Sequence, residues 1–321
     1  MMEPIFLKPV LQEKIWGGSQ LKEHFALEIP SDQTGEAWVI SAHPNGLSTV
    51  ESPKELAGMT LDQLYAEYPA LFGPQRAKTF PLLVKILDAR EDLSIQVHPD
   101  DAYAQQHEGV DELGKTECWY VISAVEGAKI VYGHHAQNEE EFRAYVNQGR
   151  YEELFREIPV QAGDFFDVPA GTIHAIGGGI TILETQQSSD TTYRVYDFDR
   201  VDANGNYREL HLEQSVDVTL FPHQDSPYTK QALSIEKNTL FELVKNQYFE
   251  VYKLEVSGTM AHQFKPNYYL ATVIEGQGQM RVAGVEYPLT LADSFILPYG
   301  SEKVEFSGDM SLIISCPREV N

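Results

Sequence analysis

The chain has 321 residues, of which 42% are hydrophobic, and its formal net charge at pH 7 is −24. This length can bury a sizeable core and supports two or three structural modules, whereas the strong negative charge argues against nucleic acids and anionic membranes as partners. No apolar run approaches a membrane span, and the first residues lack the basic and apolar regions of a signal peptide. Because Cys118 and Cys316 give no disulfide framework either, these features predict a cytoplasmic protein.

Most of the sequence consists of short strand-like runs separated by turns, and two helical insertions interrupt it. The first, at about residues 53–68, has leucine and tyrosine at helical spacing and ends near Pro69. The second, at about residues 138–158, carries an acidic run that we interpret as the solvent-facing side of a helix. We expect the second insertion to serve packing rather than chemistry.

Between the two insertions, two strand-like runs carry candidate metal ligands. Residues two apart on a strand share a face, so Gln96 and His98, in the run 93–98, are expected to point the same way. Glu117 opens the next run, and its neighbour Cys118 is expected to face away from the metal. These two runs would therefore supply an amide, an imidazole and a carboxylate.

A further candidate ligand follows the second insertion. His174 lies just past a Pro169-Ala-Gly171 turn that ends an apolar run begun at Gly163. Two imidazoles, a carboxylate and an amide oxygen together suit zinc, iron(II) or a similar borderline divalent ion. Other histidines lie off the motif positions, and we expect them at the surface: His107, His134 and His135.

The C-terminal part repeats the pattern of residues 163–174. Residues 292–303 keep its proline and glycine in register, but Lys303 stands at the position of the histidine. Pro266 likewise stands at the position of the glutamate in the first copy. We therefore expect a structural barrel that has lost its metal ligands.

A linker-like stretch, residues 221–228, precedes this repeat. It sets the predicted boundary between a metal-binding catalytic module, residues 1–228, and a C-terminal barrel, residues 229–321. The two helical insertions fall within the first module.

The ligand pattern resembles the two cupin motifs. The second cupin motif is matched without a gap by Gly163, Pro169, Gly171 and His174. The first is matched more loosely, because Gln96 stands where a cupin usually has histidine and a longer loop precedes Glu117. Cupins are double-sheet jelly rolls, so the resemblance implies a mainly β fold, a double cupin of two jelly-roll barrels with helical insertions.

Longer strings resemble the type I mannose-6-phosphate isomerases, in the short form found in many low-GC Gram-positive bacteria. The resemblance runs from about Pro4 to the C-terminus and is most specific in the Gln-x-His-Pro-Asp motif and in residues 174–194. It implies a cupin enzyme with one Zn²⁺ per chain that interconverts mannose 6-phosphate and fructose 6-phosphate. The metal ligands that it implies are Gln96, His98, Glu117 and His174.

The same resemblance implies further site residues. The essential arginine of the family falls on Arg194, its nearby acidic positions fall on Glu184 and Asp190, and its substrate-site lysine falls on Lys115. One departure concerns Ile176, where longer members of the family carry a tyrosine, so a sugar contact made by that tyrosine is not expected here.

Aldose–ketose isomerisation moves a proton from C2 to C1 through a cis-enediol, so the site needs a base, an electrophile and a grip on phosphate. We expect zinc to polarise the carbonyl and Arg194 to stabilise the enediolate. Lys115 shares a strand face with Glu117 and is expected to anchor phosphate at the pocket mouth. Glu184 or Asp190 would exchange the proton, and the sequence leaves the choice between them open.

Two alternatives remain open at this stage. His98, Glu117 and His174 also form the two-histidine, one-carboxylate triad of an iron(II) oxygenase. A sugar-binding cupin without turnover would use the same pocket. In each reading the partner is a small molecule, a sugar phosphate for the isomerase, and the protein is a monomer or a dimer.

Overall fold

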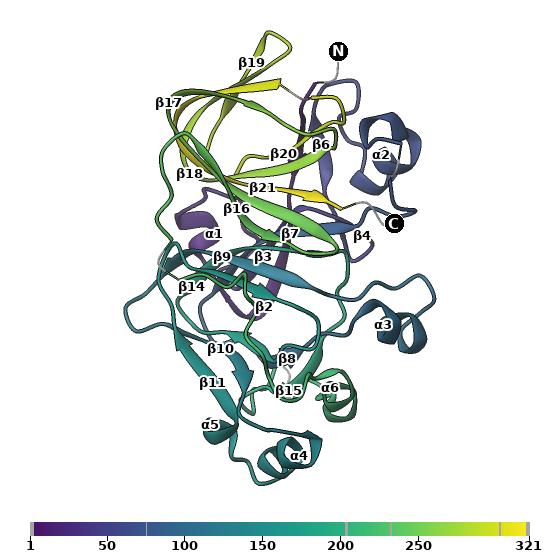
Figure 1. The fold of residues 1–321 in the computed structure, drawn as a ribbon, viewed down its shortest axis with the longest axis vertical. Helices are drawn as coiled ribbons and strands as arrows, with labels where there is room; N and C mark the ends of the chain where they lie inside the picture. The colour runs from purple at the N-terminus through teal and green to yellow at the C-terminus, as the bar shows by residue number, and fades with distance from the viewer. Residues whose placement is uncertain (1–2, 75, 203–204, 232, 302, 319–321) are drawn as a thin grey trace.

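The computed structural model describes all residues except 1–2, 75, 203–204, 232, 302 and 319–321 (Figure 1). Its elements are mainly strands, which confirms the predicted mainly β fold with helical insertions. Within these described ranges, no helix is both long enough and apolar enough to cross a membrane.

The first barrel is a sandwich of two sheets. Sheet I has the order β12-β9-β14-β7-β2-β3: β2 (Val10–Gly18), β3 (Thr34–Ile40), β7 (Leu82–Ala89), β9 (Glu117–Ala124), β12 (Phe165–Val168) and β14 (Ile180–Gln187). Sheet II has the order β11-β10-β13-β8-β15: β8 (Ile95–Val97), β10 (Lys129–His134), β11 (Phe155–Pro159), β13 (His174–Ile176) and β15 (Tyr193–Tyr196). Leu87 and Trp119 of sheet I pack against Tyr132 and Ile176 of sheet II, so the two inner faces enclose one core.

The C-terminal strands form sheet III, with the order β16-β17-β21-β18-β20-β1-β6 and β19 on β18. Its strands are β16 (Thr239–Lys245), β17 (Phe249–Gln263), β18 (Tyr269–Val282), β19 (Val285–Leu289), β20 (Ser294–Leu297) and β21 (Lys303–Pro317), joined by β1 (Ile5–Lys8) and β6 (Thr49–Ser52). The long strands curl around a core of their own, as Figure 1 shows near the top of the view. Because β1 pairs with β20, this sheet takes strands from both sides of the predicted boundary at residue 228.

The outer face of sheet I is covered by the C-terminal module. Ile86 and Leu183 of sheet I belong to the same buried cluster as Val244, Leu270 and Ile313 of sheet III. Cys118 lies in this cluster too, which confirms that its side chain faces away from the candidate metal ligands. The two modules therefore share one buried apolar layer.

Short helices decorate the strands: α1 (Gln20–Glu23), α2 (Leu61–Glu67), the 3₁₀ turn η1 (Pro69–Leu71), α3 (Asp101–His107), α4 (Glu139–Asn147), α5 (Tyr151–Leu154) and α6 (Leu212–Val218), with a small hairpin of β4 (Ala42–His43) and β5 (Gly46–Leu47). The first predicted insertion is helical only from Leu61, after a capping box at Thr60. Residues 53–58 form bends and turns, and Gly58 has a φ of +89°, which a helix does not accommodate. The second insertion gives α4 and α5, but from Phe155 onward it is the edge strand β11 of sheet II.

One smaller expectation was wrong. His134 is buried rather than at the surface, and its Nε2 lies 3.0 Å from the carbonyl oxygen of Leu220; His107 and His135 are exposed as expected. The linker-like stretch 221–228 is packed on the first barrel, where the Ser226 hydroxyl donates to Asp167 at 2.6 Å.

Candidate metal centre and active site

Sheet II brings predicted site residues from separate strands into one row. His174 on β13 is the cross-strand partner of Gln96 on β8, and Gln96 is in turn the partner of Arg194 on β15. Directly paired residues project from the same face of a sheet. The face is the inner one, because Tyr132, the other neighbour of His174, belongs to the core between the sheets.

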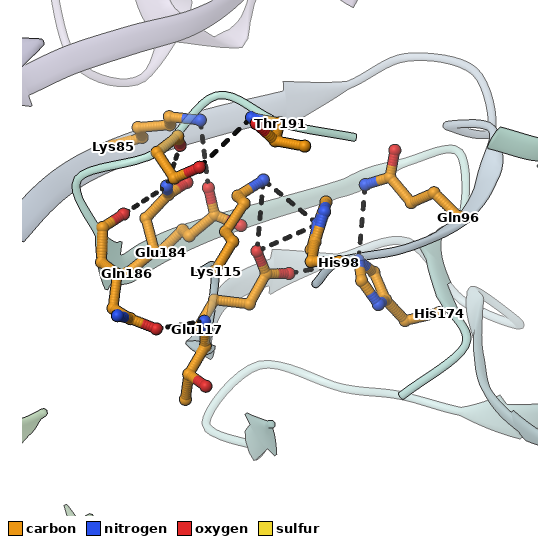
Figure 2. A network of polar contacts seen from close by, with 12 residues as sticks. Lys85, Gln96, His98, Lys115, Glu117, His174, Glu184, Gln186 and Thr191 are labelled. Atoms are coloured by element: carbon orange, nitrogen blue, oxygen red, sulfur yellow. Dashed lines mark hydrogen bonds and ion pairs between the residues drawn. The ribbon is translucent and has the colours of Figure 1, made fainter. Parts of the chain in front are cut away.

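Sheet I presents a second row to the same interior. Lys85 on β7 pairs with Trp38 on β3 and with Glu184 on β14, and Glu184 pairs with Trp119 on β9. Glu117 lies two residues before Trp119 and therefore shares its face. The two rows converge on one another inside the barrel (Figure 2).

Three of the four predicted metal ligands meet at one point. Candidate ligand atoms of His98, Glu117 and His174 all lie within 4.8 Å of one another, and each residue is 1% exposed. The Nε2 atoms of His98 and His174 are 3.4 and 3.3 Å from the two Glu117 carboxylate oxygens. This spacing around a common centre is the arrangement expected of residues that can hold one divalent ion.

The chemistry of these groups fits a metal. Burial, reinforced by the positive charge of Lys115, lowers the pKa of His98 to about 3, and burial lowers the pKa of His174 as well. Both rings are therefore neutral, which is the form that binds metals. His174 Nδ1 donates to the Thr172 carbonyl oxygen at 2.8 Å, leaving Nε2 free to act as a ligand. Among the described residues, Glu117 Oε2 is buried without a hydrogen-bond partner.

Gln96 lies at the edge of this group. Its Nε2 is 3.4 Å from His174 Nε2, and its Oε1 accepts a hydrogen bond from Ser94 Oγ at 3.3 Å. Turning the amide over would exchange its oxygen and nitrogen. Direct ligation by Gln96 stays a prediction.

Lys115 lies inside the ligand cluster, whereas the sequence had suggested a position at the pocket mouth. It is 4% exposed, and its Nζ lies 3.1 Å from His98 Nε2 and 3.4 Å from Glu117 Oε2 (Figure 2). Burial tends to raise the pKa of Glu117, but the positive charge of Lys115, together with the hydrogen bond from His98, outweighs it and holds that pKa well below its usual range. Lys115 is thus a cation at the centre of the cluster.

The pKa values of the two predicted acidic residues shift in opposite directions. Burial, together with the charge of Glu117, raises the pKa of Glu184 to about 7, although the Lys85 ammonium 3.5 Å away opposes the shift. For Asp190, the effect of burial is outweighed by Lys85 and by a 3.0 Å hydrogen bond from Asn45, so its pKa is lowered. Of these two carboxyls, Glu184 is the one whose pKa lies near neutral pH.

The sequence analysis missed Glu36. Its Oε2 accepts a 2.6 Å hydrogen bond from the Trp38 indole and lies 3.9 Å from Lys85 Nζ, while its Oε1 is 3.5 Å from Lys14. A signal was present in the sequence, because the Glu-x-Trp pattern at residues 36–38 recurs at residues 117–119.

Arg194 faces the barrel interior from sheet II. Its Nε is buried and has no hydrogen-bond partner among the described residues. Nearby, Arg200 and Arg208 share the carboxylate of Asp197. Arg208 and the carboxylates of Asp197, Asp190 and Glu209 all act on Arg194, so charges of both signs surround it.

The comparisons with known proteins agree with this geometry. A model of the phosphomannose isomerase type I catalytic domain matches residues 5–121, and a model of the mannose-6-phosphate isomerase cupin domain matches residues 239–317. The mannose-6-phosphate isomerase of Streptococcus mutans is 52% identical, over 99% of this chain and 100% of its own length. A mannose-6-phosphate isomerase of Bacillus subtilis is 46% identical, over 98% of each chain.

Solved structures extend the comparison. The crystal structure of the mannose 6-phosphate isomerase from Bacillus subtilis has a TM-score of 0.93 and 45% identity, and covers 98% of this chain and 99% of that one. The apo mannose 6-phosphate isomerase of Salmonella typhimurium, at 16% identity and a TM-score of 0.76 over 99% of this chain and 100% of its own, shares the fold.

Proposed function

The chain belongs to the type I mannose-6-phosphate isomerase family and is an enzyme of that class, and we propose that it interconverts mannose 6-phosphate and fructose 6-phosphate through a cis-enediol at a zinc site formed by His98, Glu117 and His174. The observation that carries the proposal is the buried group of two neutral imidazoles and a carboxylate, next to a carboxyl whose pKa is near 7. Zinc suits this donor set, and when bound it would supply Lewis-acid polarisation of the sugar carbonyl.

Proton transfer is assigned to Glu184. A general base works best when its pKa lies near the working pH, and among the two candidates Glu184 meets this condition while Asp190 does not. Lys85 opposes the shift of the Glu184 pKa and lies 3.5 Å from its carboxylate. We assign Asp190 a substrate-positioning role at the edge of the site, where it is half-buried beside Asn45.

The two cations receive roles opposite to those inferred from sequence. Lys115 lies against His98 and Glu117, so it is placed to stabilise negative charge on the reacting oxygens rather than a distant phosphate. Arg194 lies farther along the row, beyond Gln96, with an unpaired buried Nε and further arginines nearby. We therefore assign the phosphate group to Arg194, whose planar fork of donors matches phosphate oxygens.

A direct test is to incubate the purified protein with mannose 6-phosphate and to measure fructose 6-phosphate formation, with glucose 6-phosphate, the C2 epimer, as the matched alternative substrate. Mannose 6-phosphate is expected to be converted and glucose 6-phosphate to react far more slowly. Absence of conversion by zinc-loaded protein would favour the sugar-binding alternative without turnover. Oxygen uptake by the iron(II)-loaded form would favour the oxygenase alternative.

A further inference from the structure

Trp119 contacts three site residues at once. Its indole Nε1 lies 3.1 Å from Glu117 Oε1 and also 3.1 Å from Glu184 Oε1. Its ring stands edge-on to the His174 ring, with centroids 5.3 Å apart and an interplanar angle of 72°. The side chain is 1% exposed, so water does not compete for the indole N–H.

One donor serves two carboxylates here. An indole has a single N–H and no acceptor, so Glu117 and Glu184 share one hydrogen bond in a buried setting where each needs partners. The sharing follows from the fold, because Trp119 is the cross-strand partner of Glu184 and lies two residues from Glu117 on the same face. A change in the direction of either carboxylate therefore changes the hydrogen bond available to the other.

We propose that Trp119 is a positioning residue that couples the metal centre to the acid/base carboxyl, an inference that rests on the proposed function. Donation to Glu117 fixes the plane of the carboxylate between the His98 and His174 imidazoles. Donation to Glu184 fixes the oxygen that exchanges the proton. Because both contacts come from one N–H, a metal held by Glu117 also constrains the carboxylate of Glu184.

Sheet I contains a second tryptophan–glutamate contact that can serve as a control for Trp119 and Glu117. Trp38 is also 1% exposed and donates to the glutamate two residues before it, Glu36, at 2.6 Å. Glu36 is not a member of the metal-ligand group. Replacing Trp38 therefore removes an equivalent buried indole N–H from the same sheet without touching a metal ligand.

The test compares Trp119→Phe with Trp38→Phe in the full-length protein. Zn²⁺ affinity, measured by competition with a chelator in the absence of substrate, is expected to fall about 10- to 100-fold in Trp119→Phe, the usual effect of losing an outer hydrogen bond to a metal ligand. Trp38→Phe should bind Zn²⁺ as the unmodified protein does. At saturating Zn²⁺, Trp119→Phe should retain a lowered kcat with little change in KM, because Glu184 has lost its donor.

Equal Zn²⁺ affinities in the two variants, with both folded, would overturn the proposal. If Trp119→Phe does not fold, the double variant Trp16→Phe/Trp38→Phe leaves Trp119 as the sole tryptophan, and its fluorescence should change on Zn²⁺ addition. No change on stoichiometric Zn²⁺ binding would contradict the coupling. Because Zn²⁺ binding is measured without sugar, a failure of the isomerase proposal alone would leave the affinity result standing.

Discussion

Glu184 and Asp190 show how position sets the behaviour of chemically similar groups. Both carboxyls interact with Lys85, yet the Glu184 pKa rises and the Asp190 pKa falls. Glu184 is 3% exposed and close to the charge of Glu117, whereas half-buried Asp190 keeps a hydrogen bond from Asn45. The residue types suggested two acids, and only their surroundings distinguish the proposed proton carrier from its neighbour.

The raised pKa of Glu184 predicts a pH dependence of stability in the metal-free protein. The folded state holds a proton up to about pH 7, while the unfolded chain releases it near the ordinary value of 4.5. Between these values the folded state binds more protons, so the contribution of Glu184 to stability falls as pH rises. Glu184→Gln should therefore be more stable than the unmodified protein at pH 7.5 and similar to it at pH 4, as measured by urea midpoints.

Asp190→Asn is the matched control for this experiment. Its pKa is lowered below 3.8, so the stability that it contributes is lost only as pH falls through a more acidic range. This variant should show no gain between pH 4 and pH 7.5. A Glu184→Gln protein whose urea midpoint follows the same pH course as the unmodified protein would contradict the raised pKa.

The roles of Lys115 and Arg194 can be separated by kinetics. Lys115→Met removes a charge near the reacting oxygens, so kcat should fall about 100-fold with a smaller change in KM. Arg194→Lys keeps the charge but loses the fork of donors, so KM for mannose 6-phosphate should rise about tenfold or more while kcat is comparatively spared.

Lys129→Met is a suitable control for charge removal, because Lys129 is exposed and pairs with Glu157 on sheet II. It should leave both constants unchanged. A mainly kcat effect for Arg194 together with a mainly KM effect for Lys115 would restore the assignment made from sequence.

At the level of elements, local patterns predicted on which runs the candidate ligands lie. Gln96 and His98 lie on one strand run, and the turn before His174 places that residue at the first position of β13. The buried position of Lys115 and the row from Trp38 to Trp119 were not predictable in this way. They depend on which strands pair across sheet I, and the pairing of distant strands leaves no local signature in the chain.

The internal repeat is present in the structure. Strand β20 and the turn before β21 correspond to β12 and the turn before β13, and Lys303 begins β21 where His174 begins β13. Lys303 is exposed. Lys303→Ala should leave zinc content unchanged and alter kcat by less than about twofold, as is usual for surface substitutions. A large loss of turnover in a folded Lys303→Ala protein would show that the second barrel takes part in the chemistry.

For the whole molecule, the double-cupin fold was predicted, but the pairing of two N-terminal strands with the C-terminal sheet was not. Strand β1 pairs with β20, and β6 pairs with β1, so N-terminal residues complete the C-terminal sheet. The sequence repeat begins only after residue 228 and therefore gave no reason to assign residues 5–8 and 49–52 to the second sheet. The apolar cluster that links Ile5 and Leu7 to Ile296 and Ile313 accounts for this pairing energetically.

The arrangement as a whole places three cations of a strongly acidic protein, Lys85, Lys115 (Figure 2) and Arg194, around one interior site. Lys85 and Lys115 are each at most 4% exposed, and Arg194 reaches the same interior from the opposite sheet. A charged substrate is therefore attracted by local rather than overall charge. All of the proposed roles depend on the candidate metal site at their centre.

The most direct test measures zinc per chain and mannose 6-phosphate turnover on the same preparations of unmodified protein, His174→Ala and Gln96→Ala. The unmodified protein should contain about one zinc per chain, and His174→Ala should lose most of it together with more than about 99% of turnover. Gln96→Ala should be milder, because water can replace a neutral amide ligand. Stoichiometric zinc and normal turnover in His174→Ala would contradict the account.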